Sequence, residues 1–489
     1  FRFISFHMIF LLYKRILPDK ILLFLNIFII FIIINITYKF FQSNKEISTF
    51  YLNFIIYFSF ILFILFVILI QKSNKIKIVC KIIIFSVILS LYVIEIYLNF
   101  VHQTQTSIED LQNRQFYAKK LGIKFDTRSK YEVLNNLLEK GEIVFPTMPP
   151  NDVFSKTSKF FTNLKNPIYP LSNISNSKTV FCNESGERII YKTDRYGFRN
   201  KDNIWDEDKI DVAIVGDSLV HGACVDDEFV ISTLLNKISG KNILNLGVQG
   251  YGPLLQLAAL KEYAYFKKPK VVLWYYSEAN DLGNLNDEWK FEIIRNYKKP
   301  NFSQNLITKQ NLINQQLKDL IELVKYSEGG ELNHKEMQSK NKLIAYKESI
   351  NYLGLIKLNK LRDFLNHFLP QNKSIISYRY SDISAIDEYF KILKLADDLV
   401  KSWDGKIVVV YHPHLSRYMG NRLLTYGQKQ YDTFLKRIKD LDIDLIDIKM
   451  ELFDTLESPT DIYHFGLPGH PNEYGYQITA EKFNDFLMK

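Results

Sequence analysis

Five short, continuous apolar runs after residue 210 limit most strongly the folds that this chain can adopt. The runs cover residues 211–215, 242–246, 271–276, 406–411 and 444–448, and segments with helical spacing separate them. Strands that are apolar on both faces are typical of a parallel sheet with helices packed on both sides. The sequence therefore predicts an α/β fold, with a three-layer, flavodoxin-like parallel sheet of about five strands.

The first run is followed at once by Gly216-Asp217-Ser218. Open parallel sheets bind ligands at the carboxyl ends of their strands, so this position would expose the Ser218 hydroxyl at such an edge. A tight turn from strand into helix also aims backbone N–H groups at a negative oxygen formed beside the hydroxyl. Three residues alone are a weak signal, because Asp217 equally suits the N-cap of a helix.

Three later segments carry the other groups that such a site needs. The loop after the second run, residues 245–252, is rich in glycine, which lets the backbone approach a ligand closely. Asn280 follows the third run and offers a side-chain amide, and His470 lies on a loop directly before a predicted helix. These groups fit acyl transfer, because a weak hydroxyl needs a neighbouring base and a tetrahedral intermediate needs fixed donors.

This order of serine, glycine, asparagine and histidine resembles the SGNH (GDSL-type) hydrolase and acyltransferase superfamily, in its membrane-anchored bacterial type. The similar blocks extend over about residues 211–489, with a long interruption. The resemblance implies that Ser218 is the nucleophile and His470 the base. It also implies that the backbone N–H groups of Ser218 and Gly250 and the amide of Asn280 stabilise the oxyanion.

Two departures from the family pattern are visible. Glu278 stands where the family often has glycine, and neither Leu467 nor Pro468 supplies the acid that usually precedes the histidine by two or three residues. Asp461, nine residues upstream of His470, is the candidate for that acid, because such partners are recognised by geometry rather than by sequence position. A Ser–His dyad and an orienting backbone carbonyl are the alternatives.

The segment of residues 1–102 is predicted to be a membrane domain. Residues 21–38, 50–70 and 82–101 are apolar stretches of 18, 21 and 20 residues with few polar side chains. Each is long enough to cross the hydrocarbon core of a bilayer as a helix. A signal sequence is the alternative for the first stretch, but that stretch lacks a small-residue cleavage site and two more stretches follow it.

Charge sets the expected orientation of these three helices. Basic residues gather before the first stretch and between the second and third, and such loops stay in the cytoplasm. Three crossings from a cytoplasmic N-terminus then place everything after residue 101 outside the cytoplasm, in a protein of the cell (inner) membrane. Residues 1–105 contain ten Lys and Arg against three Asp and Glu, so +7 of the net charge of +9 belongs to this part. The remainder is nearly neutral, which argues against a nucleic-acid partner.

The rest of the chain divides into two parts. Residues 103–209 form a leader with several prolines, which we expect to wrap around the catalytic domain of residues 210–489. Within the leader, residues 194–200 are predicted to strap the edge of the sheet. About 130 residues separate the third and fourth runs, whereas connections usually have only ~2–6 residues, so a helical insertion is expected around residues 285–400. It either covers the active-site edge or lies away from it.

Cys182 and Cys224 flank the strand that leads to Ser218. In an oxidising compartment these two cysteines are able to form a disulfide, and two unpaired buried thiols are the alternative. His412 and His414 lie on one side of an extended segment, but no third ligand stands at the spacing of a metal site. The chain has no phosphate loop, dinucleotide fingerprint or zinc-type cysteine pattern, so no metal or cofactor is expected.

The sequence thus predicts a membrane-anchored, extracytoplasmic serine esterase or O-acyltransferase that uses Ser218 and His470. The expected substrates are acyl esters, acetyl esters above all, on glycans or other envelope molecules, and transfer would need a partner that donates the acyl group. A catalytically inactive glycan-binding or assembly protein with the same fold is the alternative. His464 rivals His470 as the base, and His221 is expected to cap or pack within the turn after Ser218.

Overall fold

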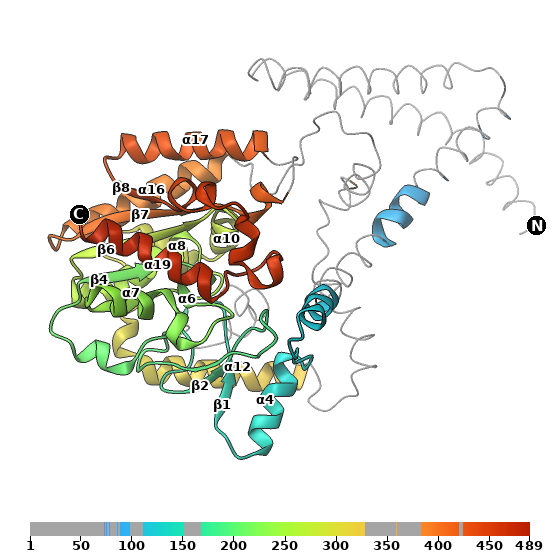
Figure 1. The fold of residues 1–489 in the computed structure, drawn as a ribbon, viewed down its shortest axis with the longest axis horizontal. Coiled ribbons are helices and arrows are strands. Elements are labelled where there is room, and N and C mark those ends of the chain that lie inside the picture. The colour runs from blue at the N-terminus through green and yellow to red at the C-terminus, as the bar shows by residue number, and fades with distance from the viewer. Residues whose placement is uncertain are drawn as a thin grey trace, which may run out of the picture. The chain divides into compact units, whose positions relative to one another are not determined.

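The structure is a computed structural model that describes residues 111–150, 168–327, 383–419 and 424–489, a helical segment at 89–97 and a few single positions (Figure 1). The chain divides into two compact units, residues 1–104 with 346–370 and residues 105–345 with 371–489. The predicted spans 21–38 and 50–70, and most of 82–101, lie outside the described residues. Of the helices in the described ranges, none combines the length and the apolar character that a membrane crossing needs.

A five-stranded, all-parallel sheet forms the centre of the larger unit, so the predicted α/β fold is confirmed. Its strands are β4 (Val212–Val215), β5 (Ile243–Asn245), β6 (Val271–Ser277), β7 (Lys406–His412) and β8 (Asp444–Asp447). Each strand matches the apolar run that predicted it to within one residue at either end. The spatial order β5-β4-β6-β7-β8 puts the first strand of the chain between the second and the third, as in flavodoxin-like sheets.

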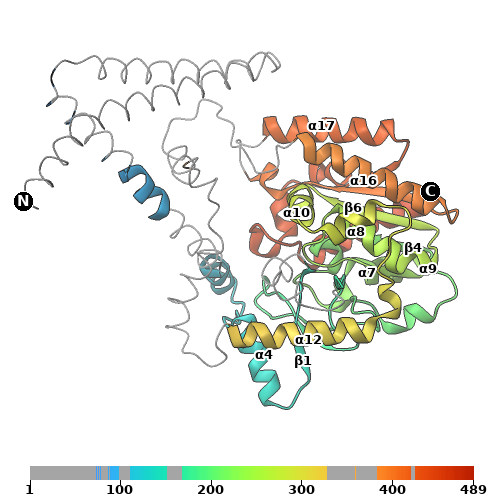
Figure 2. The same ribbon diagram turned by 180° about the vertical axis from the view of Figure 1, so that it is seen from behind.

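Helices cover both faces of this sheet (Figures 1 and 2). One face carries α8 (Pro253–Ala259), α10 (Asp281–Glu288), α16 (Ile383–Lys401) and α17 (Leu424–Asp440), and the other carries α6 (Ser218–His221), α7 (Ile231–Ser239), α18 (Ile448–Glu451) and α19 (Glu473–Leu487). Side chains of a strand point alternately to the two faces. Ala213 and Val215 accordingly join the core under α8, whereas Val212 and Ile214 join the core under α7 and α19.

Shorter elements complete the described fold. The remaining α-helices are α4 (Lys130–Glu139), α9 (Tyr265–Lys267), α11 (Glu292–Arg295) and α12 (Gln310–Ser327), and a π-helical turn, η3 (Leu260–Ala264), joins α8 to α9. The 3-10 turns are η1 (Asp202–Asp206), η2 (Asp227–Phe229), η4 (Asn296–Lys298), η5 (Leu306–Thr308), η6 (Leu415–Tyr418), η7 (Phe453–Thr455), η8 (Pro459–Ile462) and η9 (His464–Gly466).

The connection from β6 to β7 corrects the bounds of the predicted insertion. Helix α16 packs against α8 and β7, and its apolar residues, Tyr389 and Leu393 among them, are fully buried in the core. It is therefore the crossover helix of the sheet, so an insertion around residues 285–400 extends too far at its C-terminal end. The start of the insertion is anchored by buried Glu262, which accepts hydrogen bonds from the Tyr297 hydroxyl and the Leu306 N–H, both at 2.7 Å.

The leader contributes a small second sheet. Strand β2 (Lys178–Val180) pairs in parallel with β1 (Val144–Pro146) and antiparallel with β3 (Ile190–Lys192). Strands β2 and β3 thus form a hairpin, and residues 181–189 are its loop. Helix α4 packs on β1 and begins with a capping box between Ser129 and Glu132, which satisfies backbone N–H groups at the helix start.

Residues 194–200 strap the edge of the main sheet, as predicted. The Asn200 side chain accepts from the Asn245 N–H and donates to the Asn245 carbonyl, both at 2.9 Å, on edge strand β5. The turn itself is organised by the buried carboxylate of Asp194, which accepts bonds from the N–H groups of Tyr196 and Phe198 at 2.8 and 3.0 Å. The strap thereby occupies backbone groups that an edge strand would otherwise leave unpaired.

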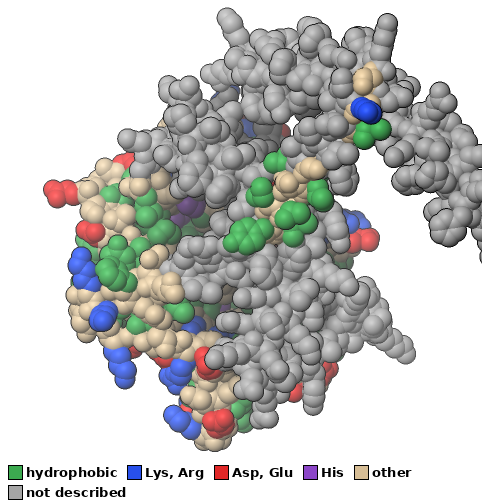
Figure 3. Space-filling view, turned by 90° about the vertical axis from the view of Figure 1, so that its right-hand side faces the viewer, with side chains coloured by type: hydrophobic (Ala, Val, Ile, Leu, Met, Phe, Trp, Pro, Cys, Tyr) green, Lys and Arg blue, Asp and Glu red, His purple; other side chains and the backbone are tan. Residues whose placement is uncertain are grey.

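Charged groups of both signs lie side by side on the surface of the described residues (Figure 3). Arg195, for example, pairs with both Asp202 and Asp206 on the surface of the strap. Such exposed pairs contribute little to stability, because water and salt screen them. The fold therefore depends on the two apolar cores and on the buried polar contacts between leader and sheet.

Gly197 provides a test of the strap. Its φ is +83°, and a Cβ atom there would lie 2.0 Å from the Asn173 carbonyl oxygen. We expect Gly197→Ala to lower the free energy of unfolding by about 3 kcal/mol or more, because the collision adds to the cost of about 1–2 kcal/mol of a left-handed alanine. Gly240→Ala is the matched control, since Gly240 has φ +67° and no atom within 4 Å of the added Cβ. Denaturant unfolding that showed equal losses in both variants would contradict this account.

Candidate active site

The predicted site residues follow the carboxyl ends of neighbouring strands. Ser218 begins α6 directly after β4, Gly250 lies in the loop after β5, and Asn280 is the N-cap residue of α10 after β6. Strand β4 lies between β5 and β6. This is the point where the strand order reverses, and open α/β sheets bind their ligands there.

Asp217 joins two of these loops. Its carboxylate caps α6 by accepting from the Leu219 N–H at 2.9 Å, and it accepts from the Asn280 side-chain amide at 2.8 Å. Burial raises the pKa of Asp217, against the lowering effect of these hydrogen bonds. An amide carries two N–H groups, so the bond to Asp217 fixes Asn280 beside the nucleophile and leaves the second N–H for a bound oxygen.

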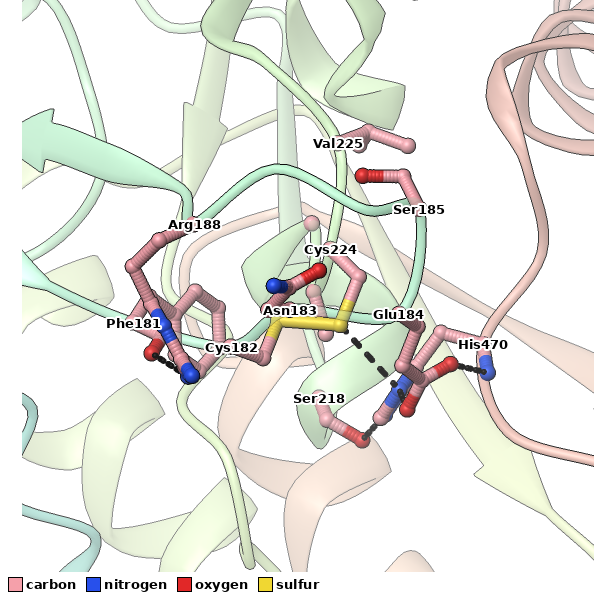
Figure 4. Close-up of a disulfide and its surroundings, with 12 residues drawn as sticks. Phe181, Cys182, Asn183, Glu184, Ser185, Arg188, Ser218, Cys224, Val225 and His470 are labelled. Atoms are coloured by element: carbon pink, nitrogen blue, oxygen red, sulfur yellow. Dashed lines mark hydrogen bonds and ion pairs between the residues drawn. A yellow bond between two sulfur atoms is a disulfide. The ribbon is translucent and has the colours of Figure 1, made fainter. Parts of the chain in front are cut away.

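Ser218, His470 and Glu184 form a continuous hydrogen-bonded chain (Figure 4). The Ser218 hydroxyl lies 2.8 Å from His470 Nε2, and His470 Nδ1 lies 2.9 Å from Glu184 Oε1. The second carboxylate oxygen of Glu184 accepts from the backbone N–H of His470 at 2.7 Å. The carboxylate therefore fixes both the position and the tautomer of the imidazole, and Nε2 is free of a proton to accept that of the hydroxyl.

The charges around this chain favour an ionised acid and a basic imidazole. Burial tends to raise the pKa of Glu184, but His470 and Arg114 outweigh it and hold the pKa at about 2. Burial tends to lower the pKa of His470, but the Glu184 carboxylate outweighs it and the pKa is raised. Arg114, whose side chain is 3% exposed, lies 3.7 Å from Glu184 and also donates to the Pro468 carbonyl. It thus links the acid to the loop that carries the histidine.

The prediction that Asp461 is the acid is wrong. Asp461 is exposed, and its carboxylate accepts a hydrogen bond from the Ser458 hydroxyl at 2.9 Å instead. The acid is Glu184, which lies in the hairpin loop of the leader and 286 residues before His470. No spacing rule reaches across such a distance, so the sequence offered no signal for it.

Gly469 is what allows the acid to approach so closely. It has φ +150°, and a Cβ atom there would lie 2.3 Å from Glu184 Oε2 and 2.7 Å from Arg114 Nη2. Any side chain at this position would push the carboxylate away from the His470 N–H. The glycine before the histidine is therefore required by the acid that arrives from the leader.

The glycine-rich loop is held from both sides. Nδ1 of His221 accepts from the Gln249 N–H at 3.2 Å, and the other ring nitrogen contacts the Tyr191 hydroxyl at 2.7 Å. Burial lowers the pKa of His221 well below its usual range, so the ring is neutral. Beyond Gly250, the buried carboxylate of Glu288 accepts from the Gly252 N–H. His221 thus packs within the turn after Ser218, as predicted, and supports the backbone next to Gly250.

The other residues that the sequence singled out have structural contacts. Glu278 forms a buried ion pair with Arg417, so it ties the end of β6 to the turn after β7 in place of the family's glycine. Both ring nitrogens of His412 contact tyrosine hydroxyls, at 2.8 and 3.1 Å. His464 is buried, and it is His470 that contacts Ser218.

Cys182 and Cys224 are joined in a disulfide. Glu184, Cys224 and His470 have ligand atoms within 4.8 Å of one another, a grouping that is compatible with a metal ion. The Cys224 sulfur is already bonded to Cys182, however, and His470 is hydrogen-bonded through both ring nitrogens. The residues therefore fit a proton-transfer chain better than a metal centre.

Comparison of the chain with known protein families and with curated proteins finds no match. What the site can do chemically is therefore argued from its geometry alone. A serine hydroxyl in contact with a buried, carboxylate-oriented imidazole is an activated nucleophile.

Replacing Glu184 by Gln tests this arrangement through its pH dependence. The imidazole must be neutral to accept a proton, so the reaction of Ser218 with a phosphonate probe should become faster as the pH rises through a His470 pKa above 6.5. Without the carboxylate, burial lowers that pKa, so in Glu184→Gln the rise should move to lower pH. The plateau rate should also fall by about 10²–10⁴-fold. Asp461→Asn is the control and should match wild type. A shifted profile in Asp461→Asn with an unchanged one in Glu184→Gln would refute the assignment.

Proposed function

We propose that the protein is a membrane-anchored serine ester hydrolase or O-acyltransferase of the SGNH type, with Ser218, His470 and Glu184 as its catalytic triad. The observation that carries the proposal is the unbroken chain of contacts from hydroxyl to imidazole to carboxylate, at 2.8 and 2.9 Å. Its position at the strand-order reversal of the sheet, beside Asn280, supports a role in binding and catalysis rather than in packing.

The reaction follows from the atoms in place. His470 Nε2 takes the hydroxyl proton while Ser218 Oγ attacks the carbonyl carbon of an acyl ester. The negative oxygen of the tetrahedral intermediate is stabilised by the N–H groups of Ser218 and Gly250 and by the Asn280 amide. The intermediate collapses as the C–O bond breaks, and the departing alcohol takes the proton from His470. An acyl group then remains on Ser218.

The second half of the cycle determines whether the protein hydrolyses or transfers the acyl group. His470 accepts a proton from water or from a sugar hydroxyl, and the oxygen of that molecule attacks the acyl carbon. The Ser218–acyl bond breaks, and the proton returns to Oγ. Water gives hydrolysis, whereas a sugar hydroxyl gives transfer and requires a partner that supplies acyl groups. The proposed substrates are acetyl or other acyl esters on envelope glycans.

Three observations support the proposed location at a membrane, with the catalytic unit outside the cytoplasm. The sequence carries three apolar stretches of 18–21 residues with basic flanks. The described helical segment 89–97 exposes apolar side chains, with Leu89, Val93 and Tyr97 exposed by 52%, 57% and 63%. Such side chains favour lipid over water. The disulfide between Cys182 and Cys224 suits an oxidising compartment.

The alternative of an inactive binding protein loses its main support. It was suggested by the lack of an acid near His470 and by the presence of Glu278. Glu184 supplies the acid from another part of the chain, and Glu278 is engaged by Arg417. The triad geometry therefore favours an enzyme.

Labelling with a fluorophosphonate tests the nucleophile. We expect wild-type protein to be labelled and Ser218→Ala to show no labelling, because the probe bonds to the activated hydroxyl. Ester hydrolysis or transfer should fall by about 10³-fold or more in the same variant. Ser458→Ala, which removes a different serine hydroxyl, is the control. A wild-type protein that resists the probe and every acyl ester tried would end the proposal in favour of the binding protein.

Acetate measurements separate the two reactions. Cells that lack the protein should carry more acetate on envelope polysaccharide if it is a hydrolase, and less if it is a transferase. Restoring wild-type protein should reverse the change, whereas restoring Ser218→Ala should not. An unchanged acetate content would show that the substrate is a different ester.

Fractionation tests the location. We expect the full-length protein to stay with the membranes after a wash with alkaline carbonate, because three apolar helices hold it in the bilayer. Protease added outside intact spheroplasts should digest the part after residue 102. Recovery of the whole protein in the soluble fraction, or full protection from that protease until the cells are lysed, would contradict the proposed topology.

A further inference from the structure

Glu184 lies on a protruding part of the leader. It belongs to the loop 181–189 of the hairpin between β2 and β3, and these strands are part of the small sheet rather than the catalytic one. Backbone bonds from Asp126 N–H to the Gly186 carbonyl and from the Asn183 amide to the Asp126 carbonyl, at 2.7 and 2.8 Å, hold the loop within the leader. These bonds shape the loop but do not attach it to the catalytic domain.

The disulfide makes that attachment next to the triad. Cys182 is two residues before Glu184, and Cys224 is six residues after Ser218. Figure 4 shows the sulfur–sulfur bond beside the Glu184 carboxylate and the His470 ring, and the Cys224 sulfur lies 3.9 Å from His470 Nδ1. One covalent bond therefore joins the segment with the acid to the segment with the nucleophile.

The nucleophile side of this bond is firmly held. Arg199, which is 4% exposed, donates to the carbonyls of Gly222 and Val225 at 2.6 and 2.9 Å, on either side of Cys224. The Ala223 N–H donates to the Ser218 carbonyl at 3.0 Å. Cys224 is thus a fixed point, so the hairpin loop is the part that gains freedom when the bond is broken.

Packing alone restrains that loop weakly. The disulfide lies in a small apolar cluster of Phe181, Ile189, Tyr191, Ala223 and Cys224, which is separate from the two main cores. A carboxylate prefers water to a buried site unless its hydrogen bonds are maintained, and ordering a loop costs about 1–2 kcal/mol per residue. An untethered loop would therefore spend time with Glu184 turned toward water and away from His470.

We propose that the Cys182–Cys224 disulfide is a positioning element of the active site, which holds Glu184 against His470 and makes catalysis depend on the oxidised state of the two cysteines. The inference rests on the proposed function. It assigns no chemical step to the sulfurs: they touch no reacting atom and act through Glu184. Reduction by an added dithiol would convert the bond into two thiols, oxidise the dithiol and release the loop.

A double-mutant cycle tests this role. In wild-type background, Cys182→Ser with Cys224→Ser should lower kcat by about 10–100-fold with little change in KM, because the acid is misplaced while the binding groups remain. The rise of the pH–rate profile should also move to lower pH, as in Glu184→Gln. In the Glu184→Gln background, the same cysteine changes should lower kcat less than about twofold, since the group they position is already absent.

Controls separate positioning from general loss of structure. Cys80→Ser, which removes the third cysteine of the chain, should match wild type. If the cysteine variants fail to fold, folded wild-type and Glu184→Gln proteins are treated briefly with dithiothreitol; the wild type should lose activity and Glu184→Gln should keep its residual activity. Equal proportional losses in both backgrounds would overturn the inference and leave the proposed function intact. A wild-type protein without Ser218-dependent labelling would instead refute the proposed function itself.

Discussion

The contact between the Glu184 carboxylate and the His470 imidazole joins two segments that lie 286 residues apart and belong to different parts of the fold. Much of the surrounding structure serves this contact. Gly469 has no side chain to obstruct it, and Arg114 lies against both the carboxylate and the histidine loop. Without the carboxylate the imidazole would be a weaker and less well oriented base. The leader is therefore a structural part of the catalytic unit.

The sheet and the residues at its edge could be predicted from the sequence because their signals are local. Continuous apolar runs mark strands that are buried on both faces, and the observed strands follow those runs closely. Parallel strands bring their carboxyl ends to one edge, so Ser218 and Asn280 were expected together. The Asn200 strap was also foreseeable, since a dense polar turn just before the first strand suits an edge that needs hydrogen bonds.

The acid and the insertion could not be predicted, because their positions depend on tertiary packing. Nothing in the neighbourhood of Glu184 distinguishes it from other surface glutamates, whereas Asp461 is closer to His470 in sequence yet points to Ser458. The crossover helix α16 was assigned to the insertion because only its burial against β7 and α8 shows that it belongs to the core. The disulfide was one of two open alternatives, since spacing does not fix cysteine pairing.

The distance along the chain between acid and base also has a temporal meaning. A ribosome makes Glu184 and Ser218 early and His470 only after the whole of the sheet, so a growing polypeptide contains the hydroxyl long before anything can deprotonate it. Contacts between such remote segments form late in folding as well. The nascent protein therefore stays chemically silent while it is synthesised and exported, and reactivity appears only once helix α19 has docked.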